Sequence, residues 1–519
     1  DDLAASGSYD GNYAEMKEFW ESRLDNIVHI KSIPNEEMRR MLYATFIQYN
    51  IIKDPYMVAP GDFRYEEIGN NIHVGENGYD KVFRADMVEM VATVINLGDL
   101  NPNDPTGVGG ADIRMNLQDI LNPMDPSLGH DTNPATKWKV PWMVACYLLK
   151  TGDTELVKKC FITEDTGDID IKECAQLVVD NIEDNGLMIQ TDIDHQGYWL
   201  MGNWNALLGL AAYDWICDEL GYEPGSPERM LQTKDRTGTV DAMDVYKELL
   251  NNCNEKLEKV MEDSAIDYLP SNIMHANDYD SLMQDERDGN WAVHLFNGRW
   301  PWEGYLLGVD QEGVMKDLID SSYEHGLKKL QMWAPGTSDN YAGIPEGSYG
   351  SFRGPEQNGD PYYKSQSTAY NASYGASALL GSTERDAGIK AVEYMLCHSF
   401  SSPYGWWESV YANTGEVPSW TPDIKGEELL NNDGHGSCPH MWGQLTALKT
   451  MMDSFISEKF DHTLIIGRGV PDEWLAEGAA PLAVDNYTVA GGKIGFTIER
   501  LNDSQVKLTV SDTREEKKG

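Results

Sequence analysis

Length, composition and charge limit what this chain can be. Its 519 residues include 85 acidic and 41 basic ones, a net charge of −44, which repels phosphate backbones and anionic membrane surfaces and excludes nucleic acid as an expected partner. No run of 18 or more apolar residues occurs, so we expect no membrane insertion.

The first 30 residues predict a linker and a lead-in helix, with Tyr13, Phe19 and Trp20 as its aromatic residues. The chain opens on Asp1 and not on Met, as after removal of a preceding segment. We therefore expect a secreted or periplasmic protein whose signal segment is not part of this sequence, and an upstream domain could precede it. The oligomeric state stays open.

Apolar residues spaced at i, i+3, i+4 and i+7 predict twelve helices. Glycines at positions 98, 152, 186 and 221 mark several of their ends. The expected ranges are 34–53, 82–97, 111–121, 139–150, 170–184, 202–220, 241–263, 300–308, 311–326, 366–380, 384–398 and 440–457.

The even-numbered helices are small and apolar on nearly every side, as in 204–213, whereas the odd-numbered ones carry one charged stripe, as in 244–252. A helix that is apolar all round is buried all round. The alternation predicts an all-α fold, an (α/α)6 toroid of six helical hairpins over residues 31–460. Longer loops lead into the inner helices, so we expect a pocket at that mouth.

Beyond residue 460 the pattern changes to β. The expected strands are 464–466, 482–484, 493–498 and 505–510, with turns at 491–492 and 502–503. They predict a small C-terminal β-sheet module over residues 461–519.

One loop, residues 402–409 with the sequence SPYGWWES, places Glu408 beside Trp406 and Trp407. Sugar sites need flat aromatic faces that stack on pyranose rings and a carboxylate for proton transfer. Glu408 is therefore a candidate catalytic carboxylate. The alternative is a surface glutamate next to a buried tryptophan pair.

The helix order, the tryptophan-rich acidic loops and the run 467–475 (GRGVPDEWL) before a β tail resemble the six-hairpin glycosidases, which include α-L-rhamnosidases, glucoamylases and glycosyl phosphorylases. The resemblance covers roughly residues 30–510 and matches no single family. It implies an inverting glycoside hydrolase with its acid between the fifth and sixth helices, within 190–199, and its base between the last two, at Glu408.

Within the first of these loops, Asp192 and Asp194 are the candidate acids. Asp194 precedes His195 and a Tyr-Trp pair that ends at Trp199, surroundings that raise the pKa of a carboxyl group by desolvation. An inverting pair needs its carboxyl groups roughly 6.5–9.5 Å apart, which two loops facing each other across a mouth can span. The alternative is that both aspartates cap the next helix or form local ion pairs.

A rival acid, Glu286, lies in the polar and aromatic loop 283–291. Its Asp-Glu-Arg string is similar to the acidic loop of α-L-rhamnosidases, although the tryptophan spacing is shifted. The alternative is a charged lid or a loop that positions substrate.

Other residues at the expected mouth are candidates for binding substrate. Arg84 and Asp86 open the second helix, where they can exchange hydrogen bonds with vicinal sugar hydroxyls, although an aspartate at a helix start is also a common electrostatic cap. Some of the aromatic candidates must be core residues. The remaining candidates are Trp138, His195, Trp199, Trp291, Arg299, Trp302, Trp333, Arg353, Trp406, Trp407 and His440.

No cofactor is expected. Phosphate-cradling glycine motifs and a dinucleotide fingerprint are absent from the sequence. The seven cysteines include no C-x-x-C pair and are predicted to be small core residues. Cys397-His398 and Cys438-Pro439-His440 hold the residue types of a zinc site, but no spacing brings them together, so we expect no metal.

Three classes of function remain, all with a carbohydrate as partner. The preferred one is a glycoside hydrolase, probed by Glu408→Gln, which should end turnover and leave binding. A polysaccharide lyase would use His195, Tyr198, His294 and Arg299 as base and neutralising groups. A non-catalytic glycan-binding protein would keep the tryptophans alone. Sugar identity, linkage and anomeric configuration stay open.

Overall fold

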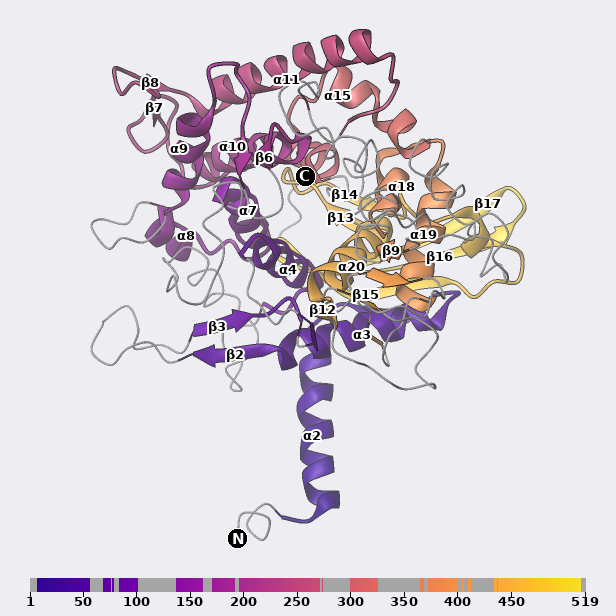
Figure 1. Ribbon diagram of the computed structural model, residues 1–519. Coiled ribbons are helices and arrows are strands. Elements are labelled where there is room, and N and C mark those ends of the chain that lie inside the picture. The colour runs from indigo at the N-terminus through magenta and orange to yellow at the C-terminus, as the bar shows by residue number, and fades with distance from the viewer. Residues whose placement is uncertain are drawn as a thin grey trace.

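Figure 1 shows the fold of the chain in a computed structural model. The residues that the structure describes are 7–56, 69–75, 77–78, 84–100, 137–161, 170–191, 196–270, 273, 299–324, 365–367, 372–398, 404–405, 409–411, 434–435 and 437–514. Among them, no helix combines the length and the apolar character needed to cross a lipid bilayer.

The centre of the molecule is a closed ring of helices. Its members are α4 Arg84–Leu97, α7 Val140–Thr151, α10 Leu200–Glu219, the π-helix η3 Arg299–Glu303 continued by α14 Gly304–Leu307, the 3-10 helix η4 Ala372–Gly375 continued by α18 Ala376–Leu380, and α20 Met441–Phe455. Helix α4 contacts α7, α7 contacts α10, α10 contacts η3 and α14, η3 contacts α18, α18 and η4 contact α20, and α20 returns to α4.

A second set of helices lies outside this ring (Figure 1). It consists of α3 Glu36–Ile51, α8 Thr154–Phe161, α9 Ile171–Asn181, α11 Ala242–Ser264, α15 Val314–Asp317 and α19 Arg385–His398. Helices α9 and α11 pack against α10, α15 packs against α11, and α19 packs against η4, α18 and α20.

Sequence explains which helices are inside. In α10 the side chains from Trp204 to Tyr213 are buried on every side, because this stretch carries no charge. Gly209 is needed there, since a Cβ atom would lie 1.7 Å from the carbonyl oxygen of Trp138. Helix α11, by contrast, buries only one stripe that includes Tyr246, Leu249 and Cys253.

The C-terminal part is an antiparallel sheet in the order β1-β15-β16-β17. Its strands are β1 His29–Ser32, β15 Leu482–Val489, β16 Gly492–Asn502 and β17 Gln505–Asp512. The first of them comes from the lead-in segment, with His29 opposite Asp485. The hairpin β13 Ile456–Glu458 and β14 Leu464–Ile466, followed by η5 Asp472–Leu475, joins α20 to this sheet.

Small sheets occupy the segments that lead into the inner helices. They are β2 Lys53–Tyr56 with β3 Gly69–Ile72, β4 Asn77–Gly78 with β12 Ser437–Cys438, β5 Gln190–Thr191 with β6 Gln196–Gly197, and β9 Ser365–Ser367 with β10 Ser409–Tyr411 and β11 Gly434–His435. Another pair, β7 Leu231–Gln232 and β8 Thr239–Val240, lies between α10 and α11. We call the end of the ring at which the inner helices begin the mouth.

Most predicted helices are confirmed within one turn at their ends. All four predicted strands are present, but β15 runs to Val489 and β16 to Asn502, beyond the expected ends at 484 and 498. The prediction of helix from residue 366 is wrong at its start, because Ser365–Ser367 pairs with β10 as a strand. The prediction for 311–326 holds in pieces, with helix at Val314–Asp317 and again over 319–324. The predicted helix 111–121 lies outside the described residues.

Candidate functional site

A buried carboxylate, Glu89, joins four elements near the mouth. Its Oε1 atom lies 2.5 Å from Nζ of Lys139 and also contacts Nη1 of Arg299, while its Oε2 atom accepts a hydrogen bond from Nε1 of Trp442. The side chains of the three charged residues are only 6–7% exposed. We call these four residues the mouth layer.

Local sequence places each member of the mouth layer at the start of an inner helix. Lys139 is the N-cap residue of α7, Arg299 opens η3, Trp442 is the second residue of α20, and Glu89 lies in the second turn of α4. Helices that begin at the same end bring their first turns together. The layer is therefore a product of ring closure, not of any one segment.

Within the mouth layer two cations lie against Glu89, and the carboxylates of Glu303 and Asp86 act on Arg299 from nearby. Burial lowers the pKa of Arg299 to about 9, and the carboxylates of Glu303 and Asp86 act in the opposite direction. The guanidinium is still charged at neutral pH. Asp86 is half-buried, so this acidic side chain keeps some access to solvent.

His440 is the N-cap residue of α20 and is 2% exposed. Its Nδ1 atom accepts a hydrogen bond from the backbone N–H of Gly443 at 3.2 Å, which assigns the proton of the neutral ring to Nε2. Burial lowers the pKa of His440 to about 3. The ring is therefore neutral at physiological pH.

The first turn of α20 also fixes the backbone that precedes Glu408. The Nε2 atom of Gln444 donates to the carbonyl oxygen of Tyr404 at 3.3 Å, to Thr45 at 3.0 Å and to Gln48 at 2.9 Å. Tyr404 itself has a φ of 58°, the left-handed region. Part of the 402–409 loop is thus attached to the mouth end of the ring.

A second group of buried charges lies further along the inner helices. Lys449 reaches Oε1 of Glu303 and Oδ2 of Asp453, each at 2.5 Å. Trp142 donates to Glu303 at 3.2 Å, and Trp302 donates to Asp453 at 3.1 Å. We call these five residues the deep layer.

The pKa directions in the deep layer follow from burial and pairing. Burial raises the pKa of Glu303, and the charge of Lys449 opposes that rise. For Lys449 burial works against the charged form, but the carboxylates of Asp453 and Glu303 outweigh it and raise the pKa. The lysine is therefore a fixed cation between two acidic groups.

Below the deep layer, Lys150 connects the ring to the C-terminal sheet. Its Nζ atom lies 2.9 Å from Oε2 of Glu458 and 2.9 Å from the carbonyl oxygen of Thr488. A cavity of about 30 Å³ is lined by residues of both groups, including Glu303 and Asp453. That volume suits one water molecule and no sugar.

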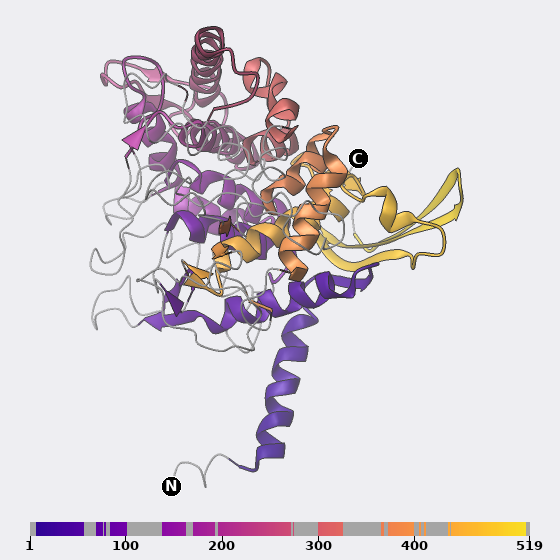
Figure 2. The same cartoon turned by 45° about the vertical axis from the view of Figure 1, so that its right-hand side comes forward.

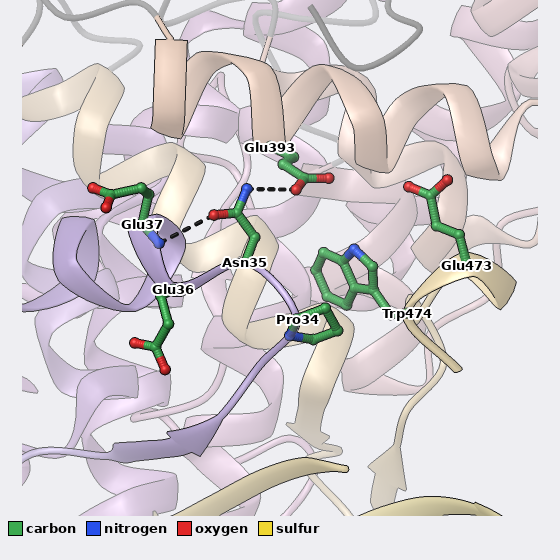
Figure 3. Close-up of a pocket in the computed structure, with 7 residues that line it drawn as sticks. All are labelled: Pro34, Asn35, Glu36, Glu37, Glu393, Glu473 and Trp474. Atoms are coloured by element: carbon green, nitrogen blue, oxygen red, sulfur yellow. Dashed lines mark hydrogen bonds between the residues drawn. The ribbon is translucent and has the colours of Figure 1, made fainter. Parts of the chain in front are cut away.

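Two wider hollows lie elsewhere on the described surface. One, of about 640 Å³, lies between the turn at Gly98, Tyr147 and Lys493 near the sheet. The other, of about 450 Å³, lies at the start of α3 and is lined by four glutamates with Pro34, Asn35 and Trp474 (Figure 3). There Asn35 donates to Glu393 at 2.6 Å and accepts from the backbone of Glu37. Neither hollow is lined by residues of the mouth layer.

The four predicted catalytic residues, Asp192, Asp194, Glu286 and Glu408, lie outside the described residues. Their described neighbours lie in segments that lead into inner helices: β5 and β6 flank 192–195 and precede α10, and Ser409 follows Glu408 in β10 before α20. Their roles stay predictions.

Some predicted binding residues come together and others do not. Arg299 belongs to the mouth layer, and His440 and Asp86 lie close to it in α20 and α4. Trp302 belongs to the deep layer, while Trp138 and Trp199 are 1% and 2% exposed inside the ring. Arg84 opens α4. The remaining candidates lie outside the described residues: His195, Trp291, Trp333, Arg353, Trp406 and Trp407.

The prediction missed Glu89, Lys139, Glu303, Lys449 and Asp453. A signal for them exists in the sequence, because each is one of only two or three charges within or beside a mostly apolar inner helix, as Glu89 is between Val88 and Met90. Charges are buried almost only when they are paired. A charge flanked by apolar residues in a helix predicted to be buried therefore indicates an ion pair.

Comparisons with known proteins give a limited result. No protein-family model matches the chain, and no curated protein matches it. Among solved structures the chain is similar to cellobiose 2-epimerase from Bacillus thermoamylovorans, with 11% identity and a TM-score of 0.43, over 80% of this chain and 98% of that one.

Proposed function

We propose that this chain is a carbohydrate-active enzyme, and more narrowly a glycoside hydrolase built on an (α/α)6 toroid. The observation that carries the proposal is the closed ring of inner helices with the charged mouth layer at the end where they begin. Active sites of helical bundles are built from side chains of facing helices. The mouth is where the loops that hold the candidate carboxylates begin and end.

The proposed chemistry uses one carboxyl group as acid and one as base. Glu408 is the proposed base, and Asp194, Asp192 or Glu286 is the proposed acid. Inversion requires the two groups to be roughly 6.5–9.5 Å apart, with water held on the opposite ring face. The anchoring of Tyr404 by Gln444 supports this role, because it fixes the backbone four residues before Glu408 to the mouth.

In this proposal the mouth layer binds and does not react. Arg299 and Lys139 are both held by Glu89, so they can donate hydrogen bonds to sugar hydroxyls without rearranging. Asp86 is half-buried and can accept from such hydroxyls. Preorganised donors of this kind cost little reorganisation during turnover.

The test is a screen of aryl glycosides and oligosaccharides, with NMR identification of the first product. We expect release of the aglycone together with a free sugar whose anomeric configuration is inverted relative to the substrate. A rearranged sugar with no bond cleaved would replace the hydrolase by an isomerase, and an unsaturated product would replace it by a lyase. Binding without any product would leave a glycan-binding protein.

A pair of variants then assigns the base. Glu408→Gln should reduce turnover at least about 100-fold while sugar binding persists, because general acid–base catalysis typically contributes 10²–10⁴. The matched control is Glu248→Gln on α11, whose side chain is exposed on the outside of the ring. Equal turnover in the two variants would remove Glu408 from the mechanism.

A further inference from the structure

Helix α2, Tyr9–Leu24, projects from the body of the molecule with its N-terminal end farthest away (Figures 1 and 2). Every residue from 9 to 19 is exposed. Its base is fixed, because Arg23 is buried and donates to Asp99 and Asn50, each at 2.9 Å. The helix is therefore held out into solvent from a rigid root.

Helix α2 gains little stability from packing on the rest of the described chain. In proteins most helical stability comes from tertiary packing, and an interior glycine costs roughly another 1 kcal/mol. Helix α2 has 16 residues, only just above the about 12–15 residues below which isolated helices are marginal, and it carries Gly11 in its first turn. The described residues supply no surface that covers residues 9–19, so we look for a partner surface outside them.

The apolar residues of α2 show what kind of surface that is. Tyr9, Tyr13, Met16 and Trp20 follow one another at intervals of four, three and four residues, which is the a/d spacing of a coiled-coil seam. Tyr9 is 82% exposed, Tyr13 53% and Met16 49%. Such a seam fits another helix with the same spacing.

The seam is symmetric about its own centre. If a second α2 lies antiparallel, Tyr9 faces Trp20 of the other copy and Tyr13 faces Met16, so that two layers repeat by twofold symmetry. Asp10 and Lys17 both occupy the position that follows a d residue, on the same flank of the seam. In the antiparallel pair this flank of one helix lies against the same flank of the other helix, so Asp10 of each copy lies near Lys17 of the other copy.

The size of the body selects the antiparallel arrangement. Paired helices lie only about 8–10 Å apart, so a parallel pair would force two large bodies into the same space. In an antiparallel pair the bodies lie at opposite ends of helices about 24 Å long. That separation exceeds the Debye length of about 8 Å at physiological ionic strength, which limits repulsion between two chains of charge −44.

We propose that α2 is a dimerisation helix whose partner is the α2 helix of a second copy of this chain, packed antiparallel along Tyr9, Tyr13, Met16 and Trp20. Phe19, which lies edge-on to Trp20 with ring centroids 5.1 Å apart, flanks the seam. Together the two stripes bury on the order of 1,000 Å², near the lower limit for a specific interface. The proposal is independent of the proposed function.

Sedimentation equilibrium of the full chain between about 1 and 100 μM tests it, a range in which an interface of this size is expected to dissociate. We expect a monomer–dimer equilibrium that tightens as salt rises, since screening reduces the repulsion between the bodies. Tyr13→Ser/Met16→Ser should raise the dimer Kd more than tenfold. The matched control, Glu15→Ser/Glu18→Ser on the opposite face of α2, should leave it unchanged within about twofold.

Two results would overturn the proposal. One is a monomer at every concentration, which would leave the seam to a different partner. The other is a dimer that survives the seam variant, for example one lost in Leu508→Ser on β17, where Val506, Leu508 and Val510 are also exposed. Orientation is tested by mixing Tyr13→Cys with Met16→Cys chains. Antiparallel packing predicts more 13–16 than 13–13 disulfide under mild oxidation.

Discussion

The mouth layer and the deep layer contain the same kinds of side chain in different arrangements. Both hold buried carboxylates, cations and tryptophan N–H donors. In the mouth layer two cations share Glu89, whereas in the deep layer one cation, Lys449, lies between two carboxylates. The mouth layer lies at the end of the ring where the segments with the candidate carboxylates lead into the inner helices, and the deep layer lies beside a water-sized cavity.

This difference separates a layer that can bind from a layer that stabilises. Buried ion pairs contribute little net stability relative to apolar residues, but removing one partner is costly. Among the described residues neither layer lines a hollow large enough for a sugar, but the mouth layer lies where the segments with the candidate carboxylates lead into the inner helices. We therefore expect variants of the deep layer to change the free energy of unfolding, and variants of the mouth layer to change activity as well.

The largest effect is expected from Lys449→Met. It leaves the carboxylates of Glu303 and Asp453 buried without their cation, which should lower the free energy of unfolding by about 3–5 kcal/mol. The control is Arg40→Met, since Arg40 forms an exposed pair with Glu37 and should cost less than about 1 kcal/mol. Urea unfolding of both variants measures the difference. A small loss for Lys449→Met would mean that the deep layer does not stabilise the ring.

The pH dependence of stability should come in part from His440. Its folded-state pKa of about 3 is below the ordinary value near 6.5, so the unfolded chain binds more protons between these values and stability falls as pH decreases through that window. At pH 5 the loss from this group is about 2 kcal/mol relative to pH 8. His440→Asn keeps an N-cap acceptor and cannot titrate.

The comparison of wild type with His440→Asn separates the contribution of His440 to the pH dependence of stability from the contributions of the many carboxylates. The drop in unfolding free energy between pH 8 and pH 5 should be about 2 kcal/mol smaller in the variant. His29→Asn is the control, because His29 is half-buried in β1. Equal slopes in all three proteins would mean that His440 is not buried as a neutral ring.

Arg299→Lys tests whether the mouth layer contributes to activity and not only to stability. It keeps a cation beside Glu89 but loses the planar fork that can bind a carboxylate and a hydroxyl at once. We expect kcat/KM to fall at least about tenfold, which is 1.4 kcal/mol, with a stability loss of similar size or smaller. An unchanged kcat/KM would place Arg299 outside the substrate site.

Sequence predicted much of the ring because helix periodicity is local. The expected range 440–457 became α20 Met441–Phe455, and 34–53 became α3 Glu36–Ile51. The start of the helix expected at 366 failed because strand pairing with β10 is not local. For the same reason the pairing of β1 with β15, across more than 450 residues, had no signal in either segment alone.

The site was less predictable than the fold. Glu89, Arg299 and Trp442 are far apart in sequence and meet only because α20 returns to α4. Local sequence shows that a charged residue lies in an apolar helix, but it does not show which residue of another helix pairs with that charge. Arg299 and His440 were predicted from their place in or at the ends of the polar and aromatic loops expected at the mouth, which is the part of the site that local sequence can give.

The most specific comparison is between two tryptophan variants, one from each layer. Trp442→Phe removes the donor to Glu89, and Trp302→Phe removes the donor to Asp453, so each should lower the free energy of unfolding by about 1–3 kcal/mol. If the two layers differ as argued, only Trp442→Phe should change kcat/KM, because it loosens the carboxylate that holds Arg299 and Lys139. Matched stability losses with a severalfold difference in kcat/KM would support the division. Equal kcat/KM values would mean that the mouth layer, too, only stabilises the ring.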